Sequence, residues 1–100
     1  MLIDKYFDYQ IKYENIYGLN TVVLMEVGSF YELYGVDNKK EQIGDIKKIT
    51  DLLNIILTRR NKSIIENSRK NSLMAGFPIK YGTVLQKREG YNSSPEFHHI

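Results

Sequence analysis

The feature that most constrains the fold is an aliphatic, largely β-branched run at residues 21–27, TVVLMEV, followed by Gly28-Ser29 and FYELY at residues 30–34. Such a run is typical of a buried strand, and the glycine and serine are typical of a turn, so the sequence predicts two consecutive strands. We expect Gly28 to allow the turn geometry and Gly35 to end the second strand. Side chains alternate along a strand, so Phe30 and Glu32 share one face. An aromatic ring beside a carboxylate makes a poor core surface, because a buried charge needs a partner, so we expect an exposed tip.

The rest of the chain alternates between helical and strand patterns. Apolar residues at helical spacing predict a first helix that ends before Gly18 and a second helix in which Gly44 is a candidate start. Together these patterns indicate an α/β (α+β) fold, a mixed β-sheet flanked by about three helices. We expect helices at 3–17, 38–54 and 80–89, strands at 21–27, 30–34, 54–60 and 72–78, and a polar loop at 61–71.

The composition limits the class of protein. One hundred residues suffice for one small domain, and a net charge of +2 neither indicates nor excludes a nucleic-acid partner. The lack of cysteine excludes disulfides, thiolate metal sites and cysteine nucleophiles. No pattern of a signal peptide is present, and no apolar run is long enough to span a bilayer, so we expect an intracellular protein without a membrane partner. Cytoplasm, nucleus, mitochondrion and viral factory all stay open as compartments.

The motifs of catalysis are missing from the sequence. There is no phosphate-binding G-x-x-x-x-G-K-[ST] loop and no G-x-G-x-x-G. The adjacent residues His98 and His99 point apart in any regular structure, and we expect an irregular tail there. The acids Asp37, Glu41 and Asp45 suit a solvated helix face better than a magnesium site. We therefore predict no enzyme, no catalytic residue, no metal site and no cofactor in this chain.

Basic residues cluster around the expected loop. Arg59, Arg60 and Lys62 follow the expected strand that leads into it, and Arg69 and Lys70 close it. Flexible cations beside an exposed turn are what phosphate contacts require. The alternative is a charged loop that only keeps the surface solvated, and from composition alone this alternative is the better interpretation.

Three ordered blocks carry a resemblance to a known family. They are VVLMEVGSFYELYG at residues 22–35, LLNIILTRR at residues 52–60 and LMAGFP at residues 73–78. Their order and spacing resemble the N-terminal mismatch-recognition domain (domain I) of the MutS family of DNA mismatch repair proteins, and the wording of the first block is most similar to the organellar and viral-type branches. The opening YFDYQIKYENIYG resembles the first helix of that domain.

The resemblance implies a function for the opening motif. In MutS proteins the phenylalanine of F-x-E enters the minor groove at a mismatch and stacks on a mispaired base, and the glutamate hydrogen-bonds to that base. By motif position these residues are Phe30 and Glu32, with Gly28 at the turn. Arg59, Arg60 and Lys62 become expected backbone contacts. The implied partners are double-stranded DNA with mismatches or small loops, and the rest of a MutS-type protein or a dimer partner.

The sequence also departs from the family pattern. After Gly90-Tyr91 the family runs into an apolar strand, whereas this chain continues NSSPEFHHI, and Pro95 argues against a strand. We therefore expect an incomplete mismatch-recognition domain over residues 1–91 with its final strand missing, and an irregular tail over residues 92–100. The ATPase part of the family, with its ATP and magnesium, is not expected here. The alternatives are a truncated remnant that acts as a protein-interaction or scaffold module without DNA binding, and a nuclease-like α/β domain.

Overall fold

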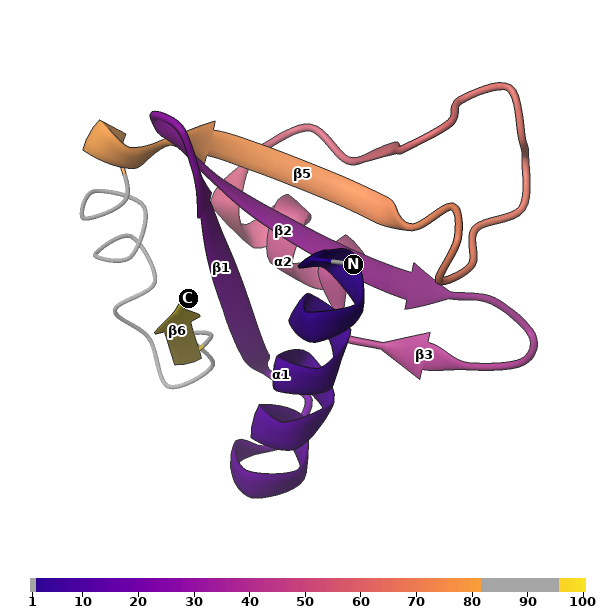
Figure 1. Cartoon of the computed structure of the whole chain (residues 1–100), viewed down its shortest axis with the longest axis horizontal. Helices are drawn as coiled ribbons and strands as arrows, with labels where there is room; N and C mark the ends of the chain where they lie inside the picture. Colours follow the sequence, from indigo (N-terminus) through magenta and orange to yellow (C-terminus); the bar gives the residue numbers. More distant parts are fainter. Residues whose placement is uncertain (1, 82–95) are drawn as a thin grey trace.

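The computed structural model describes residues 2–81 and 96–100 (Figure 1). The first expected helix and the first strand form over almost the expected ranges, because their apolar spacing is regular. In chain order the elements are α1 (Leu2–Tyr17), β1 (Thr21–Val27), β2 (Phe30–Asp37), β3 (Gln42–Ile43), α2 (Ile46–Leu53), β4 (Thr58–Arg59), β5 (Leu73–Pro78), the 3-10 turn η1 (Ile79–Tyr81) and β6 (Glu96–His99).

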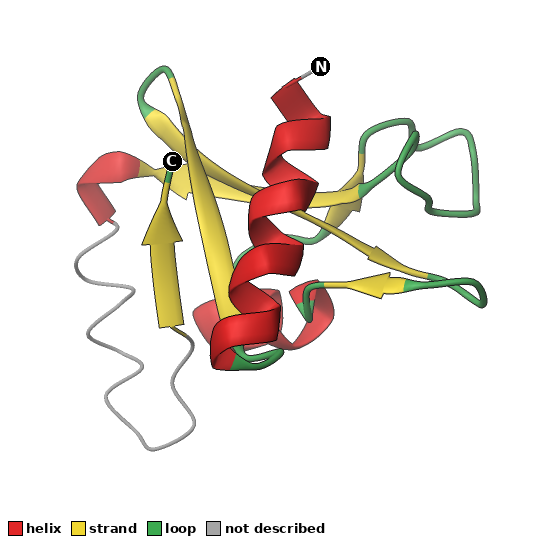
Figure 2. Ribbon diagram, turned by 60° about the horizontal axis from the view of Figure 1, so that its bottom comes forward, coloured by secondary structure: helices red, strands yellow, loops and turns green. Residues whose placement is uncertain are grey.

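The strands form one mixed sheet between two helices, which confirms the expected α+β class. The strand order is β4-β5-β2-β1-β6, and β3 pairs with β2 beside this path. Strands β1 and β6 are parallel, and the other pairs are antiparallel. Helix α1 lies on one face of the sheet and α2 on the other (Figures 1 and 2). The ring of Tyr6 in α1 packs 5.1 Å from the ring of Tyr34, whereas Ile46 of α2 packs against Gly35 on the opposite face.

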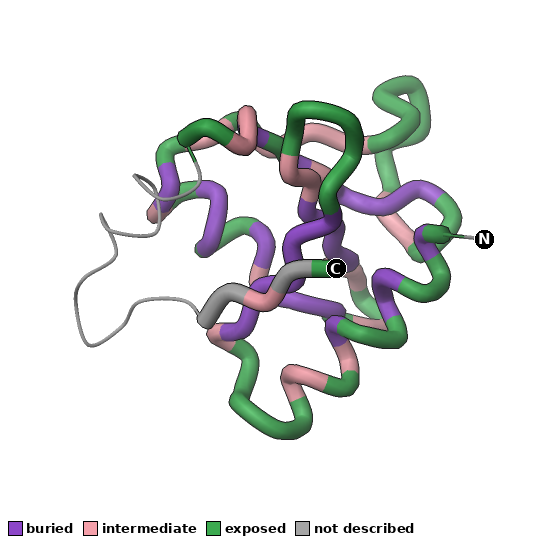
Figure 3. The backbone as a smooth tube through the Cα atoms, turned by 60° about the vertical axis from the view of Figure 1, so that its left-hand side comes forward, coloured by how far each residue is buried: buried purple, intermediate pink, exposed green. Residues whose placement is uncertain are grey.

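The hairpin that dominates the sequence forms as expected. Val27 pairs with Phe30 across the turn, and Gly28 has a φ of +59°, a conformation that side chains disfavour. Burial follows the strands: β1 is buried from Thr21 to Met25 and then becomes exposed toward the turn (Figure 3). The hairpin therefore has a packed base and an exposed end.

Strands β1 and β2 pair only near the turn, and helix α1 supplies partners for β1 where β2 is not paired with it. The buried amide of Gln10 donates a 2.7 Å hydrogen bond to the Thr21 carbonyl and accepts a 3.0 Å bond from the Val23 N–H. The hydroxyl of Tyr6 donates a 2.6 Å bond to the Val23 carbonyl. These groups belong to Thr21 and Val23, which alternate along β1 with Met25 and Val27. The backbone groups of all four residues therefore point toward the side of β1 on which β2 lies. Two side chains thus replace a strand partner, as buried backbone groups require.

Several expected boundaries are wrong, each for a local reason. Gly35 does not end the second strand: β2 continues to Asp37 because β3 and β5 pair with it. The second helix begins only at Ile46, after Gly44 with a φ of +74°, so the glycine marks the start as suggested. Strand β4 is limited to two residues instead of residues 54–60. Most of the third expected helix falls on residues 82–95, outside the described residues.

The prediction that the final strand is missing and that the tail is irregular is wrong for residues 96–99. Thr21 pairs with Glu96 and Leu24 with His99 in a parallel ladder that the Ile100 N–H extends to the Leu24 carbonyl at 2.9 Å. The His98 ring also stacks on Tyr13, with ring centroids 4.3 Å apart. Pro95 comes before this strand in the sequence, and a proline is compatible with a strand that begins after it.

Candidate nucleic-acid interface

Phe30 stands at the exposed end of the hairpin. It is the first residue of β2, pairs with Val27 on one side and with Pro78 of β5 on the other, and its side chain is 46% exposed. Exposure of a large aromatic side chain to water at the end of a hairpin is unfavourable unless another molecule covers it. The position suits a residue that contacts a partner.

Glu32 lies on the same face as Phe30, as strand alternation predicts, and it is held in place. The hydroxyl of Tyr34, two residues further along the same face, donates a hydrogen bond to its carboxylate. Burial and this hydrogen bond raise the pKa of Tyr34 well above its usual value, so the hydroxyl keeps its proton at neutral pH. One carboxylate oxygen of Glu32 is therefore committed to Tyr34, and the other is available for further contacts.

A hollow of about 240 Å³ lies on this face beside Glu32. It lies between the first turn of α1 and the surface of the sheet. The polar residues that line it are Glu32, Tyr34 and Arg60. Its apolar wall comes from Leu2, Ile3, Met25 and Val27.

Tyr31 points to the opposite face and packs inward. Its ring meets the ring of Phe77 edge-on at 5.8 Å, and the pair packs against the core. Strand β5 lies next to the motif in the sheet. Its residues Met74, Gly76 and Pro78 pair with Tyr34, Glu32 and Phe30, respectively. The hairpin thus has one core-facing row and one row that presents Phe30 and Glu32.

The three expected backbone-contact cations do not form one cluster. Arg59 turns into its own loop, where its guanidinium donates to the carbonyls of Ile64 at 2.9 Å and Lys62 at 3.1 Å. Arg60 points the other way, toward the face of Glu32 and Tyr34. The side chain of Lys62 is exposed on the loop. Strand alternation separates Arg59 from Arg60, and only Arg60 joins the motif.

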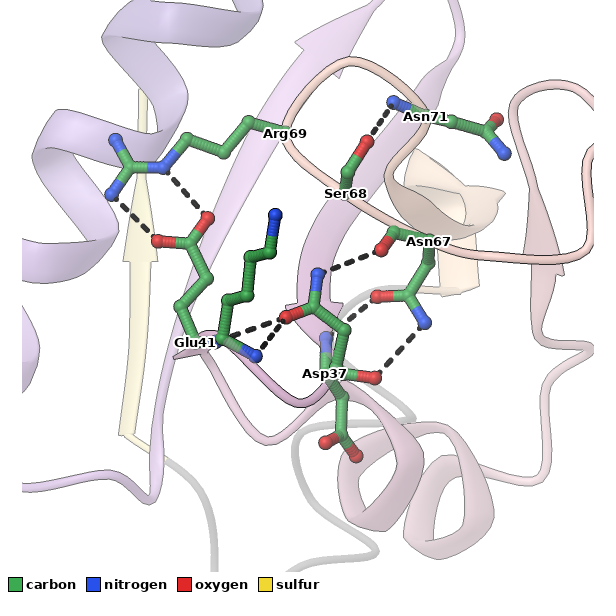
Figure 4. Close-up of polar contacts among 8 residues, drawn as sticks. Asp37, Glu41, Asn67, Ser68, Arg69 and Asn71 are labelled. Carbon is green, nitrogen blue, oxygen red and sulfur yellow. Dashed lines mark hydrogen bonds and ion pairs between the residues drawn. The ribbon is translucent and has the colours of Figure 1, made fainter.

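The polar loop at 61–71 is tied to the turn between β2 and β3 (Figure 4). The side-chain amide of Asn67 accepts a 2.7 Å bond from the Asp37 N–H and donates a 2.9 Å bond to the Asp37 carbonyl. Asn38 donates to the Asn67 carbonyl at 2.8 Å. The guanidinium of Arg69 donates two hydrogen bonds, of 2.9 and 3.0 Å, to the carboxylate of Glu41, and this pairing lowers the pKa of the Glu41 carboxyl. The loop is therefore fixed, and Arg69 is engaged in a salt bridge.

Two of the three acids Asp37, Glu41 and Asp45 form ion pairs. Asp37 pairs with Lys47 at 3.2 Å and Glu41 pairs with Arg69. Within residues 2–81 and 96–100 no group of three histidine or acidic side chains is placed to hold a metal ion. In the same part of the chain, no helix combines the length and apolar character needed to cross a membrane.

One part of the chain is similar to a curated protein. Over 64 residues the chain is 36% identical to a putative DNA mismatch repair protein, a mutS homolog of Acanthamoeba polyphaga mimivirus. The chain contains a MutS-related region. The match covers 64% of this chain and 6% of the relative, so the chain corresponds to a small part of that protein. No family model and no solved structure matches the chain.

Sequence reasoning missed Tyr34 as part of the site and missed that Arg60 shares its face. The signal was present: Tyr34 follows Glu32 by two residues, and the period of a strand puts both on one side. The same alternation places Arg59 and Arg60 on opposite faces. Which of the two shares the face of Glu32 could not be assigned before the bounds of the strand were known.

Proposed function

We propose that this chain binds duplex DNA at mismatches and small loops, with Phe30 inserted from the minor groove and Glu32 hydrogen-bonded to the mispaired base. The observation that carries the proposal is the exposed phenylalanine on the same face as a carboxylate held by Tyr34. The relationship to a mutS homolog supports it.

Phe30 discriminates through the cost of opening the DNA stack. An apolar wedge between base steps costs a few kcal/mol of unstacking. A mispaired step is already weakened, so the wedge enters there at lower cost than in intact duplex. Selectivity then depends on deformability of the DNA, which suits a protein that accepts many different mismatches.

Glu32 acts on selectivity more than on affinity. Phosphates repel a carboxylate, so its presence favours complexes in which a base donates a hydrogen bond to it and disfavours the others. Tyr34 fixes one oxygen and so limits the directions from which the base is contacted. The cationic side chain of Arg60 on the same face offsets part of the repulsion.

Arg60 and Lys62, with Arg59, contact the DNA backbone in this proposal. Arg60 has the most direct access, since it lines the hollow that Glu32 also lines, and Lys62 is exposed on the adjoining loop. Such contacts supply affinity without sequence information and make binding strongly dependent on salt. A module of this size makes a small interface, so we expect weak binding that is measurable at low salt.

The test is fluorescence anisotropy of labelled duplexes, fully matched or with one central G·T mismatch, at about 50 mM salt. We expect the wild type to prefer the mismatch, and Phe30→Ala to lose that preference by a factor on the order of ten, because stacking of one base contributes about 1–3 kcal/mol. Tyr9→Ala is the matched control, since Tyr9 is an aromatic residue with 40% exposure on helix α1.

Equal binding of both duplexes by the wild type would refute the proposal. Absence of any binding would favour the alternative, a protein-interaction module. Ile56, which is 85% exposed, lies beside a second hollow with Tyr81, and this is the surface that such a module would use. Cleavage that depends on magnesium would favour a nuclease. ATP, magnesium and a dimer partner belong in this proposal to the larger protein of which such a module is a part.

A further inference from the structure

The hollow beside Glu32 has the size, walls and polar groups of a receptor for one base. Building on the proposed function, we propose that this hollow receives the base of an extrahelical nucleotide, so that single-nucleotide bulges are bound by capture of the extra base while Phe30 fills the gap in the stack. Insertion of Phe30 and the hydrogen bond of Glu32 at a mismatch do not themselves require this hollow.

The position of the hollow supports the proposal. It lies on the Phe30 face of β2, and its wall residue Val27 is the direct cross-strand neighbour of Phe30. A nucleotide displaced where Phe30 enters therefore has a cavity within reach on the same surface. Extrusion costs least for a base that has no partner, as in a bulge.

The chemistry of the walls fits a nucleobase. Proteins that hold an extruded base pack apolar side chains on its faces and place hydrogen-bonding groups at its Watson–Crick edge. Here Leu2, Met25 and Val27 are among the apolar residues that supply the packing surface. The remaining oxygen of Glu32 accepts from an amino group, and Arg60 donates to a ring nitrogen or carbonyl. Cytosine and adenine present an amino group beside a ring acceptor, so they are the preferred occupants.

The charge of the hollow also selects this occupant. Glu32 and Arg60 bring one negative and one positive group to the same wall, which matches a neutral group with both donors and acceptors. A phosphate would be repelled by the carboxylate of Glu32. A purely apolar side chain that excluded water would leave the guanidinium of Arg60 and the second carboxylate oxygen of Glu32 without partners.

The experiment compares three duplexes by anisotropy: one with a bulged deoxycytidine, one with a bulged abasic site and one with a G·T mismatch. Both bulges bend easily, so their difference reports on the base itself. We expect the wild type to bind the cytidine bulge on the order of tenfold more tightly than the abasic bulge.

Leu2→Trp enlarges a side chain that lines the hollow and leaves Phe30, Glu32 and Arg60 themselves unchanged. Leu2 is 62% exposed, so the change places little strain on the core, and a urea denaturation curve checks this. We expect this variant to bind the two bulges equally and to bind the G·T duplex as the wild type does. Ile16→Trp is the matched control, because Ile16 is 59% exposed at the other end of the same helix.

Two results would overturn the inference: equal binding of the two bulges by the wild type, or an unchanged preference in Leu2→Trp. Failure of the proposed function gives a different pattern, since then the G·T duplex is bound no better than matched DNA. A cytidine preference that Leu2→Trp removes, in a chain that ignores G·T, would support the hollow and refute the wedge.

Discussion

Gln10 offers the sharpest test of how this fold is held together. Its side chain is 2% exposed and makes three hydrogen bonds: to the Thr21 carbonyl at 2.7 Å, to Glu14 at 2.9 Å and from the Val23 N–H at 3.0 Å. In Gln10→Leu the Val23 N–H and the Thr21 carbonyl stay buried and lose their partner.

The magnitude follows from these two backbone groups. Each buried group left without a partner costs about 1–3 kcal/mol. Burial of the leucine side chain returns about 1–2 kcal/mol, so the net loss lies between about 0 and 5 kcal/mol, with a central value of about 2.5 kcal/mol. Glutamine and leucine have similar helix propensity, so the helix itself contributes little to the difference. Against a total of about 5–15 kcal/mol, the loss is large.

The assay is equilibrium unfolding in urea, with hydrogen exchange of the Val23 amide as a local readout. Gln42→Leu is the matched control, because Gln42 is exposed on β3, and we expect it to change stability by less than about 0.5 kcal/mol. Tyr6→Phe removes the hydroxyl that donates to the Val23 carbonyl and should cost about 1 kcal/mol or somewhat more. If Gln10→Leu unfolds at the urea concentration of the wild type, with Val23 still protected, the side chain is not the partner of this strand.

Three further predictions concern packing and charge. Gly35→Ala places a Cβ 2.8 Å from Cγ2 of Ile46, so we expect a loss of about 1–3 kcal/mol in urea unfolding, and a gain would show that α2 moves away freely. The pKa of Tyr34 is raised in the folded state, so on raising the pH the unfolded chain loses this proton first. The contribution of Tyr34 to stability is therefore full below about pH 10 and falls as the pH rises. Tyr34→Phe should make that fall shallower in unfolding curves recorded from about pH 9 to 11. Buried Tyr6 has a pKa shift of the same sign, so a slope should remain, and an identical slope in the variant would contradict the assignment. Arg69 lowers the pKa of Glu41, so their ion pair contributes to stability above about pH 4.3 and this contribution is lost at lower pH. Arg69→Gln should lower the free energy of unfolding by less than about 1 kcal/mol at pH 7 and leave it unchanged at pH 2.

The hairpin was predictable because its information is local. A β-branched run, a glycine with positive φ and a period of two fix the faces of Phe30, Tyr31 and Glu32 without knowledge of the rest of the chain. The same holds for helix α1, whose apolar spacing is regular up to Gly18.

The elements that were missed depend on partners far away in sequence. Strand β6 has a polar sequence after a proline and becomes a strand because β1 has a free edge beside it. Gln10 looks like a surface residue in a helical pattern, and only the limited pairing between β1 and β2 makes it a core residue. Arg59 and Arg60 are neighbours in sequence, yet the strand turns them to opposite sides.

The contacts of β1 also set an order in which the chain can fold. Its bonds to Tyr6 and Gln10 span 11 to 17 residues, whereas its ladder with β6 joins residues 21 and 96. Near contacts form faster than distant ones, because a longer loop must close before a distant pair is gained. An early unit of α1 and the β1–β2 hairpin would therefore expose the outer edge of a buried, aliphatic strand until β6 arrives. Such an edge pairs readily with another chain, so β6 protects this domain from aggregation as well as completing its sheet.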